Sequence, residues 1–276
     1  MVIDSSLKDK KFFIEFDGVQ KYCQLYVNGK KVGEHKGGFN SFSMDITDYI
    51  DWAVDTQTIA VSVNGYRRDK WQIPPMTAGN WNVYSGIYRP VRLMVKNNIY
   101  IPYQGNSEHE GGTFVTTPFV RNDSTIIEVK TFVKNDTPNT ELITLRTVIT
   151  DKNENVLAEI ETAKSLPKGQ IIEYQQKSPI LKGLERWSHE NPVLYKVHSY
   201  IYRDRELTDY YQSPLGIRTF YWDYQTNHLF VNGKKINLKG INRHQEYPWL
   251  GDAIPEWITI KDMEDIRYGM GINFMR

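Results

Sequence analysis

The stretch that decides the fold is IIEVKTFV at residues 126–133, where the side chains alternate over eight residues. A period of two residues is typical of a β-strand that packs one face on a core. Similar stretches occur at regular spacing around it. They are Thr113–Arg121, Leu142–Thr150, Ile171–Gln176 and Tyr195–Tyr202. This spacing predicts an immunoglobulin-like β-sandwich over residues 97–220, of the kind without a disulfide because Cys23 is the single cysteine.

The first 96 residues show the same pattern of strands separated by turns, at Phe12–Phe16, Cys23–Val27, Thr58–Val63 and Tyr88–Val95. Asn28-Gly29 directly follows the second strand, and this dipeptide suits a type I′ hairpin turn, which needs two residues with positive φ. No segment in this part has a helical period. We therefore expect one antiparallel sandwich here.

The pattern changes near residue 220. Leu229–Val231 runs into a second hairpin dipeptide, Asn232-Gly233, and Ile236–Asn242 is expected to be the next strand. Thr259 followed by Asp262 predicts a helix start of the capping-box type, with Ile260, Met263, Ile266 and Met270 on one face. Ile272–Met275 then predicts another strand. Strand, helix and strand form a βαβ unit, which implies a parallel sheet.

This last segment is too short for a complete parallel fold. A closed eight-stranded barrel takes roughly 250 residues. A single βαβ unit cannot cover both faces of a parallel sheet. We therefore expect either that the rest of this domain is missing or that the segment packs against a partner.

The overall composition excludes some classes of partner. The 276 residues carry a formal net charge of +1, so neither nucleic acid nor an anionic membrane is expected as a partner. No window reaches the ~18 consecutive apolar residues of a membrane helix. The first residues do not form a signal peptide. The localisation stays open: a leader upstream would make the parent periplasmic or secreted, and otherwise it would be cytoplasmic.

Several motifs, in order along the chain, carry a family resemblance. The strongest is NLKGINRHQE at residues 237–246, continued by GDA at 251–253 and GINFMR at 271–276. The upstream motifs are GGF at 37–39, DITDYI at 45–50, YSGIYR at 84–89, WSHENPVLY at 187–195 and GIR at 216–218. Together they resemble glycoside hydrolase family 2, which holds β-galactosidases, β-glucuronidases and β-mannosidases.

The resemblance implies an architecture that is mainly β. A jelly-roll-like sandwich would occupy residues 1–96, with its first strands missing. An immunoglobulin-like sandwich would occupy residues 97–220. Residues 221–276 would begin an incomplete (β/α)₈ catalytic barrel, so the chain would be truncated at both ends.

The resemblance also implies retaining hydrolysis of β-linked glycosides, most simply β-galactosides in carbohydrate catabolism. Such hydrolysis uses two carboxyl groups about 5–5.5 Å apart, one as acid and base and one as nucleophile. Both family glutamates would follow Arg276, so no catalytic residue is assigned within the chain and the chain alone is expected to be inactive. Glu246 and Glu256 do not match those positions and are interpreted as barrel-mouth or solvated residues.

Five residues are expected at or near the sugar site. His244 matches the family histidine that binds sugar hydroxyls, and an imidazole can both donate and accept a hydrogen bond. Asn80 stands where the family often has aspartate, and Trp249 is favoured over Trp71, Trp81 and Trp257 for stacking on a sugar. Arg243 is expected to pair with an acid, and Arg276 to support the nucleophile. Purely structural roles remain the alternative for each.

No cofactor and no metal site is expected in this chain, although the full-length parent could bind a divalent or monovalent cation through later strands. The expected partners are a β-linked glycoside, and either further copies in a homo-oligomer or a complementing chain that carries the barrel. The alternative to an enzyme fragment is a non-catalytic carbohydrate-binding or subunit-complementation module. The sugar and its linkage cannot be derived from these residues.

Overall fold

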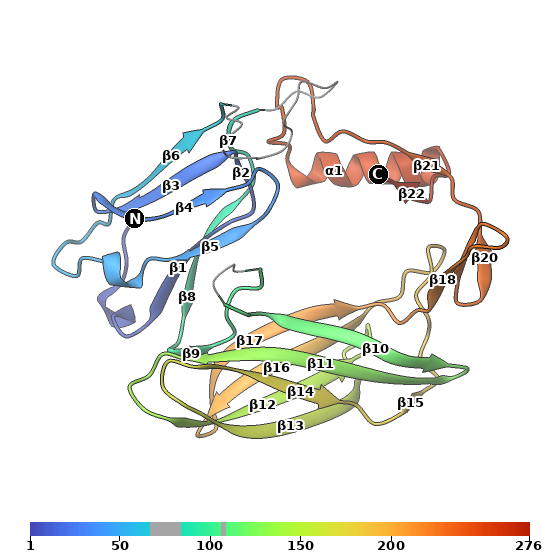
Figure 1. Cartoon of the computed structure of the whole chain (residues 1–276), viewed down its shortest axis with the longest axis horizontal. Helices are drawn as coiled ribbons and strands as arrows, with labels where there is room; N and C mark the ends of the chain where they lie inside the picture. The colour runs from blue at the N-terminus through green and yellow to red at the C-terminus, as the bar shows by residue number, and fades with distance from the viewer. Residues whose placement is uncertain (67–83, 106–108) are drawn as a thin grey trace. The chain divides into compact units, whose positions relative to one another are not determined.

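The computed structural model describes residues 1–66, 84–105 and 109–276, and it is mainly β (Figure 1). The chain forms two compact units. One comprises Met1–Val95 together with Lys239–Arg276, and the other comprises Lys96–Leu238. The division into three domains at residues 96 and 220 stays a prediction.

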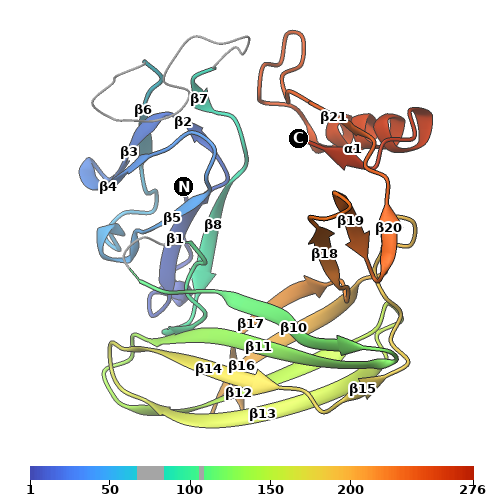
Figure 2. The same cartoon turned by 45° about the vertical axis from the view of Figure 1, so that its right-hand side comes forward.

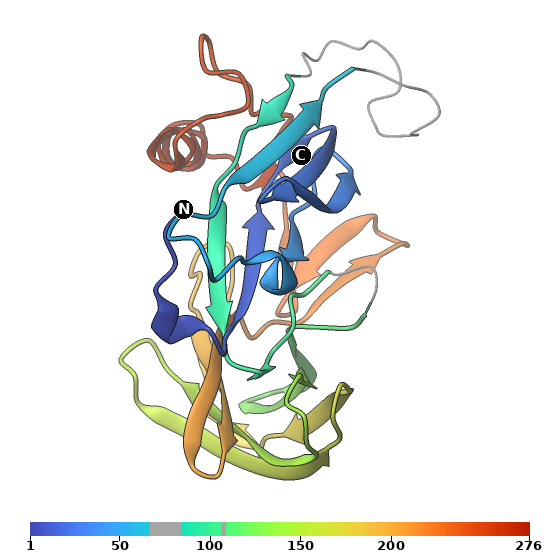
Figure 3. The ribbon, with the colours of Figure 1, turned by 90° about the vertical axis from the view of Figure 1, so that its left-hand side faces the viewer.

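The N-terminal part of the first unit is a sandwich of short strands (Figure 3). Its elements are η1 (Ser5–Leu7), β1 (Lys11–Phe16), β2 (Val19–Gln20), β3 (Tyr22–Val27), β4 (Lys30–Lys36), β5 (Phe42–Asp45), η2 (Thr47–Tyr49), β6 (Ile59–Asn64), β7 (Gly86–Ile87) and β8 (Val91–Lys96). Two three-stranded sheets have the orders β5-β1-β8 and β4-β3-β6, and β2 pairs with β7. The pairs β1–β5, β2–β7, β3–β4 and β3–β6 are all antiparallel.

The core of this sandwich follows from the two-residue period of its strands. Phe12, Ile14 and Phe16 on β1 pack in one buried cluster with Cys23 and Leu25 on β3. Burial alternates strictly along both strands, as the sequence predicts. The predicted hairpin turn is also confirmed, because Asn28 has φ of 51° and Gly29 has φ of 78°.

The second unit contains a larger β-sandwich (Figure 1). Its strands are β9 (Ile99–Tyr100), β10 (Thr113–Arg121), β11 (Ser124–Asn135), β12 (Glu141–Thr150), β13 (Val156–Leu166), β14 (Ile171–Lys177), β15 (Leu181–Lys182), β16 (Tyr195–Arg203) and β17 (Glu206–Leu215). One sheet has the order β10-β11-β14, with β9 and β15 also paired to β11, and the other has the order β13-β12-β16-β17. Side chains from both sheets form the buried clusters between them, for example Ile127 with Ile149.

Three further strands follow in this unit: β18 (Phe220–Asp223), β19 (His228–Val231) and β20 (Lys234–Ile236). Asn232 and Gly233 form the predicted turn, with φ of 51° and 77°. The single strand expected over Ile236–Asn242 is wrong. The chain instead leaves β20 at Ile236 and begins β21 at Gly240–Ile241, because Ile236 pairs antiparallel with Leu229 whereas Gly240 pairs parallel with Phe274.

The predicted βαβ arrangement is present in the first unit (Figure 2). Helix α1 (Glu256–Glu264) continues as a π-helical turn (Asp265–Gly269) and leads to β22 (Phe274–Met275), which pairs parallel with β21. That this unit opens a (β/α)₈ barrel remains a prediction. None of the helices in the described ranges combines the length and apolar character that a membrane span requires.

The start and the buried face of α1 differ from the prediction. The helix begins at Glu256 after Pro255, so Thr259 lies inside it and caps nothing. Proline suits this place because its fixed φ is compatible with a helix start. Ile258 is the buried helical residue, while Ile260 and Met270 of the predicted face are exposed.

Candidate functional site

Three of the predicted site residues, Arg243, His244 and Arg276, lie where the two parallel strands end. The backbone N–H of Arg276 donates to the carbonyl of Ile241 at 3.0 Å, and the N–H of Arg243 donates to the carbonyl of Arg276 at 3.0 Å. The strand pairing therefore continues one residue beyond β22 and brings Arg243 next to Arg276. His244 follows directly and is exposed. Carboxyl ends of parallel strands are where ligands bind in parallel α/β folds.

Arg243 has the acidic partner that the sequence predicts. Its Nη2 lies 2.5 Å and its Nε 3.2 Å from Oδ2 of Asp262 on helix α1. The Arg243 side chain is 14% exposed. The ion pair fixes the guanidinium on the helix side of β21, so Asp262 orients Arg243 rather than capping the helix.

Trp249 lies at the tip of the loop between β21 and α1. Tyr247 and Gly251 pair across this loop, and the N–H groups of Leu250 and Gly251 both donate to the Tyr247 carbonyl. Trp249 has φ of 69° and is fully exposed. An indole held open to solvent on a closed turn can stack on a ligand without first breaking packing contacts.

Asp252 is a residue of this region to which the sequence assigned no role. It is 5% exposed, and neither carboxylate oxygen has a hydrogen-bond partner among the described residues. Burial, with a smaller effect from Glu246, raises the pKa of Asp252, while the positive charge of Arg89 lowers it. Asp252 and Arg89 both lie in motifs that carry the resemblance, GDA and YSGIYR, but no spacing rule reveals that this carboxyl is buried.

The remaining predicted residues are placed as follows. Asn80, Trp71 and Trp81 lie outside the described residues, so their predicted roles stay predictions. Trp257 is exposed on α1. Glu256 is the exposed first residue of α1, and Glu246 is half-buried in the loop before it.

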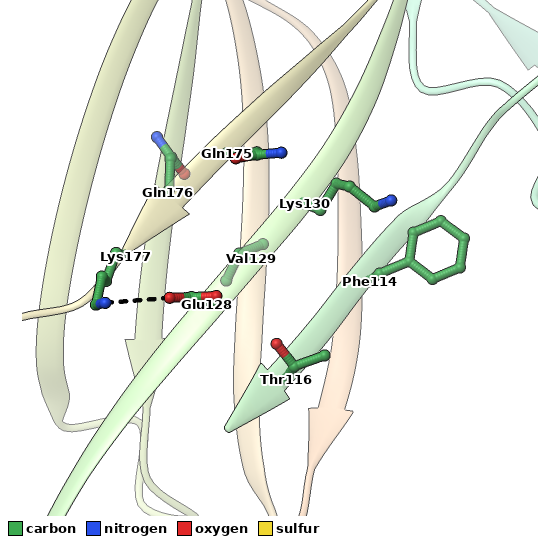
Figure 4. Close-up of a pocket in the computed structure, with 8 residues that line it drawn as sticks. All are labelled: Phe114, Thr116, Glu128, Val129, Lys130, Gln175, Gln176 and Lys177. Atoms are coloured by element: carbon green, nitrogen blue, oxygen red, sulfur yellow. Dashed lines mark ion pairs between the residues drawn. The ribbon is translucent and has the colours of Figure 1, made fainter. Parts of the chain in front are cut away.

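A separate groove of about 440 Å³ lies on the β10, β11 and β14 strands of the second unit (Figure 4). Lys177 and Glu128 form an ion pair of 3.2 Å across its edge. Its lining residues are Phe114, Thr116, Glu128, Val129, Lys130, Gln175, Gln176 and Lys177. None of the predicted site residues is among them.

Within residues 1–66, 84–105 and 109–276, no group of three or more His, Cys, Asp or Glu side chains could hold a metal ion. Cys23 is buried in the N-terminal sandwich. Burial raises the pKa of this thiol to about 11, so Cys23 is a packed core residue rather than a reactive thiolate.

Two family models match the chain. The model of the sugar-binding domain of glycosyl hydrolases family 2 matches residues 1–97, and the model described as glycosyl hydrolases family 2 matches residues 111–218. The chain belongs to glycosyl hydrolase family 2.

Known relatives align with almost the whole of this chain. A β-galactosidase of Thermoanaerobacter pseudethanolicus is 30% identical over 276 residues, which are 99% of this chain and 35% of the relative. A β-glucuronidase of Formosa agariphila is 32% identical, over 98% of this chain and 28% of the relative. The crystal structure of a Bacteroides uniformis β-glucuronidase matches with a TM-score of 0.91 and 28% identity, over all of this chain and 32% of that one.

The 276-residue chain therefore spans about a third of the length of the curated relatives it matches. The relatives include both β-galactosidases and β-glucuronidases, so membership supports a glycosidase class without choosing the sugar.

Proposed function

We propose that this chain is the front part of a retaining exo-β-glycosidase that hydrolyses β-galactosides. In this proposal the two catalytic carboxyl groups stand outside the 276 residues, and the chain by itself does not turn over substrate. The observation that carries the proposal is the pair of parallel strand ends, where Arg243 and Arg276 are hydrogen-bonded neighbours and His244 follows. The β21–α1–β22 unit would be the first βαβ unit of a (β/α)₈ barrel.

The roles of the side chains follow from their chemistry. His244 can donate from one ring nitrogen and accept at the other, which suits a pair of sugar hydroxyls. Trp249 would stack on the apolar face of a sugar ring, and Asn80 would contribute amide donors and an acceptor. Arg276 would stabilise the negative charge of the nucleophilic carboxylate. Arg243, tied to Asp262, would support the strand end.

The choice of sugar is the part of the proposal most in need of a test. The parent protein should be assayed with aryl β-galactoside, β-glucuronide, β-mannoside and β-glucoside. The proposal expects turnover of the β-galactoside above the others, with retention of anomeric configuration. Preference for the β-glucuronide would move the assignment to the other activity named among the relatives, and inversion would rule out the double displacement.

The inactivity of the chain needs its own test. The 276-residue protein should show no turnover of the same β-galactoside beyond the uncatalysed rate. Turnover by the purified chain, with no contaminating enzyme, would overturn the placement of the catalytic carboxyl groups.

A second candidate is a carbohydrate-binding or complementation module without catalysis. The observation in its favour is the set of large exposed apolar side chains within Lys239–Arg276, since such a set marks an interaction surface. It includes Trp257, Ile260, Tyr268, Met270 and Phe274. The candidate predicts that the chain binds a separate chain carrying the missing barrel strands and gains activity on mixing. If mixing the two chains gives no activity while a single longer chain is active, the complementation candidate is rejected and the enzyme-fragment proposal stands.

A further inference from the structure

Two residues that precede strand β8 contact the loop carrying the candidate site. Nη2 of Arg89 donates to Oε1 of Gln245 at 2.9 Å, across 156 positions of sequence. Tyr84 lies flat against Gly251, because a Cβ at Gly251 would come within 3.0 Å of the Tyr84 ring. Gly251 also has φ of 58°, so no other residue fits this approach without strain. The loop from Gln245 to Asp252 is therefore held at both ends by residues of the N-terminal part of the same unit.

Asp252 makes this contact electrostatically unusual. A carboxylate that is 95% buried without a hydrogen bond is costly unless a cation lies near it, and Asp252 has no such bond among the described residues. Among the described residues, Glu246 adds to the effect of burial on Asp252, and the positive charge of Arg89 opposes both to a smaller extent. The Arg89 guanidinium thus acts on two residues of the loop. It donates a hydrogen bond to Gln245, and its positive charge acts on Asp252.

We propose that Arg89 is a positioning residue that holds the loop Gln245–Asp252 in place, and with it His244 and Trp249. No role of this kind follows from the sequence motifs. Its meaning for sugar binding depends on the proposed function, but the positioning of the loop does not. The proposal makes two separable claims: that the loop loosens when Arg89 loses its hydrogen bond to Gln245, and that part of the loosening comes from losing the charge of Arg89 near the buried Asp252.

The first claim is tested by amide hydrogen exchange on the 276-residue chain, followed by mass spectrometry. In Arg89→Gln the peptides that cover residues 245–253 should exchange roughly tenfold faster or more, the loss expected from one hydrogen bond to a charged group. Peptides from β12 and β16 should be unchanged, which shows that the second unit stays folded. Loop exchange equal to that of the wild type would overturn the proposal.

Arg92→Gln is the matched control. Arg92 lies on β8, is half exposed and pairs with Asp17 at 2.5 Å, so its replacement removes the same charge close by without touching the loop. Loop exchange in Arg92→Gln should stay within about twofold of the wild type. If this control loosens the loop as much as Arg89→Gln does, a general loss of positive charge is the cause and the proposal fails.

The second claim is tested by adding Asp252→Asn. An asparagine needs no cation, so Arg89→Gln combined with Asp252→Asn should exchange more slowly at the loop than Arg89→Gln alone, by at least about threefold. Arg89→Lys should also recover part of the protection because it keeps the charge. A purely steric role for Arg89 would give no recovery from Asp252→Asn, and that result would overturn the electrostatic claim.

The link to the site is tested with methyl β-galactoside as the probe, read by the tryptophan fluorescence of the chain. Weaker binding in Arg89→Gln than in Arg92→Gln supports the link between loop position and sugar binding. A loop that loosens in Arg89→Gln while the wild type binds no sugar supports the positioning and counts against the proposed sugar site. The two proposals can therefore fail independently.

Discussion

Arg243 at the end of β21 and Asp262 on α1 are joined by two hydrogen bonds to the same carboxylate oxygen, at 2.5 Å and 3.2 Å. The pair connects the first strand of the βαβ unit to its helix at the point where the candidate site begins. Because the Arg243 side chain is only 14% exposed, loss of its partner would leave a largely buried charge unpaired. The local order of this segment therefore depends on the pair.

Asp262→Asn should destabilise the helix α1 segment by about 1.5–3 kcal/mol, the usual range for a hydrogen bond to a charged group. The measurement is amide exchange of the peptides that cover Glu256–Glu264 in the 276-residue chain. Asp265→Asn is the control, since Lys261 on α1 and Asp265 just beyond it form a solvent-exposed pair that should contribute much less to stability. Equal effects of the two substitutions would show that the burial of Arg243 does not matter.

Tyr174→Phe should lower the free energy of unfolding of the β9–β17 sandwich by about 0.5–1.5 kcal/mol. The Tyr174 hydroxyl is fully buried and donates to the Ile143 carbonyl of the facing sheet at 2.9 Å. Burial also raises the pKa of Tyr174, so the hydroxyl remains a donor at neutral pH. Urea unfolding followed by circular dichroism measures the change. Tyr224→Phe, at an 89% exposed tyrosine, should leave the midpoint unchanged, and a loss as large as that of Tyr174→Phe would contradict the prediction.

His198 predicts a loss of stability on mild acidification. It is 8% exposed, with one ring nitrogen 2.8 Å from the Tyr210 hydroxyl and the other 3.2 Å from the Thr150 hydroxyl. Burial lowers the pKa of His198 from 6.5, against the opposing charge of Glu154 and with a smaller contribution from Lys196. The unfolded chain therefore binds this proton more readily, and the stability that the neutral ring provides is lost as pH falls below the unfolded value.

The measurement is the urea midpoint of the second unit at about pH 7.5 and about pH 5.5. The midpoint should fall more in the wild type than in His198→Gln, whose side chain does not titrate. His228→Gln in the β18–β20 sheet is the matched control and should behave as the wild type does. If the urea midpoint of His198→Gln falls as much as that of the wild type, other groups cause the pH dependence. Glu154 and Glu159, whose pKa values are lowered by hydrogen bonds from Lys196 and Arg146, lose their contribution only at more acidic pH.

Under the proposed function, we expect Trp249→Ala to weaken β-galactoside binding in the longer protein. Loss of one aromatic contact worth about 0.5–1.5 kcal/mol corresponds to a rise in KM of roughly 2–10-fold, with little change in kcat. The assay is steady-state kinetics with the aryl β-galactoside. Trp257→Ala is the comparison, because Trp257 is also exposed but lies on α1. An effect confined to Trp257→Ala would move the stacking role from the loop to the helix.

The strands that the sequence predicted are those whose period is reinforced by burial. Residues 126–133 lie within β11, which is hydrogen-bonded on both sides and alternates in burial over most of its length. The strands β13 and β17 were missed. Both lie at the edges of their sheet, and β17 in particular has few buried positions, so the local alternation is weak.

The candidate site residues stay predictions, but part of their arrangement is now known. The family motif pointed to His244, Arg243 and Arg276, and the parallel strand pairing brings the last two together. The same motif did not reveal the helix start at Glu256, because the cap-like Thr259 and Asp262 fit a local rule that the structure does not use. It also did not reveal the burial of Asp252, which follows Gly251, the residue that packs on the distant Tyr84 ring.

The sequence by itself determined the strands with strong alternation, the two Asn-Gly turns and the family, because each of these depends on neighbouring residues or on motifs read in order. Only the tertiary structure decided that Arg243 pairs with Asp262, that Arg276 lies beside Arg243, and that Arg89 reaches Gln245. The physical reason is that such contacts depend on how distant segments pack, and the free energy of burying a charge depends on that packing and not on its neighbours in the chain.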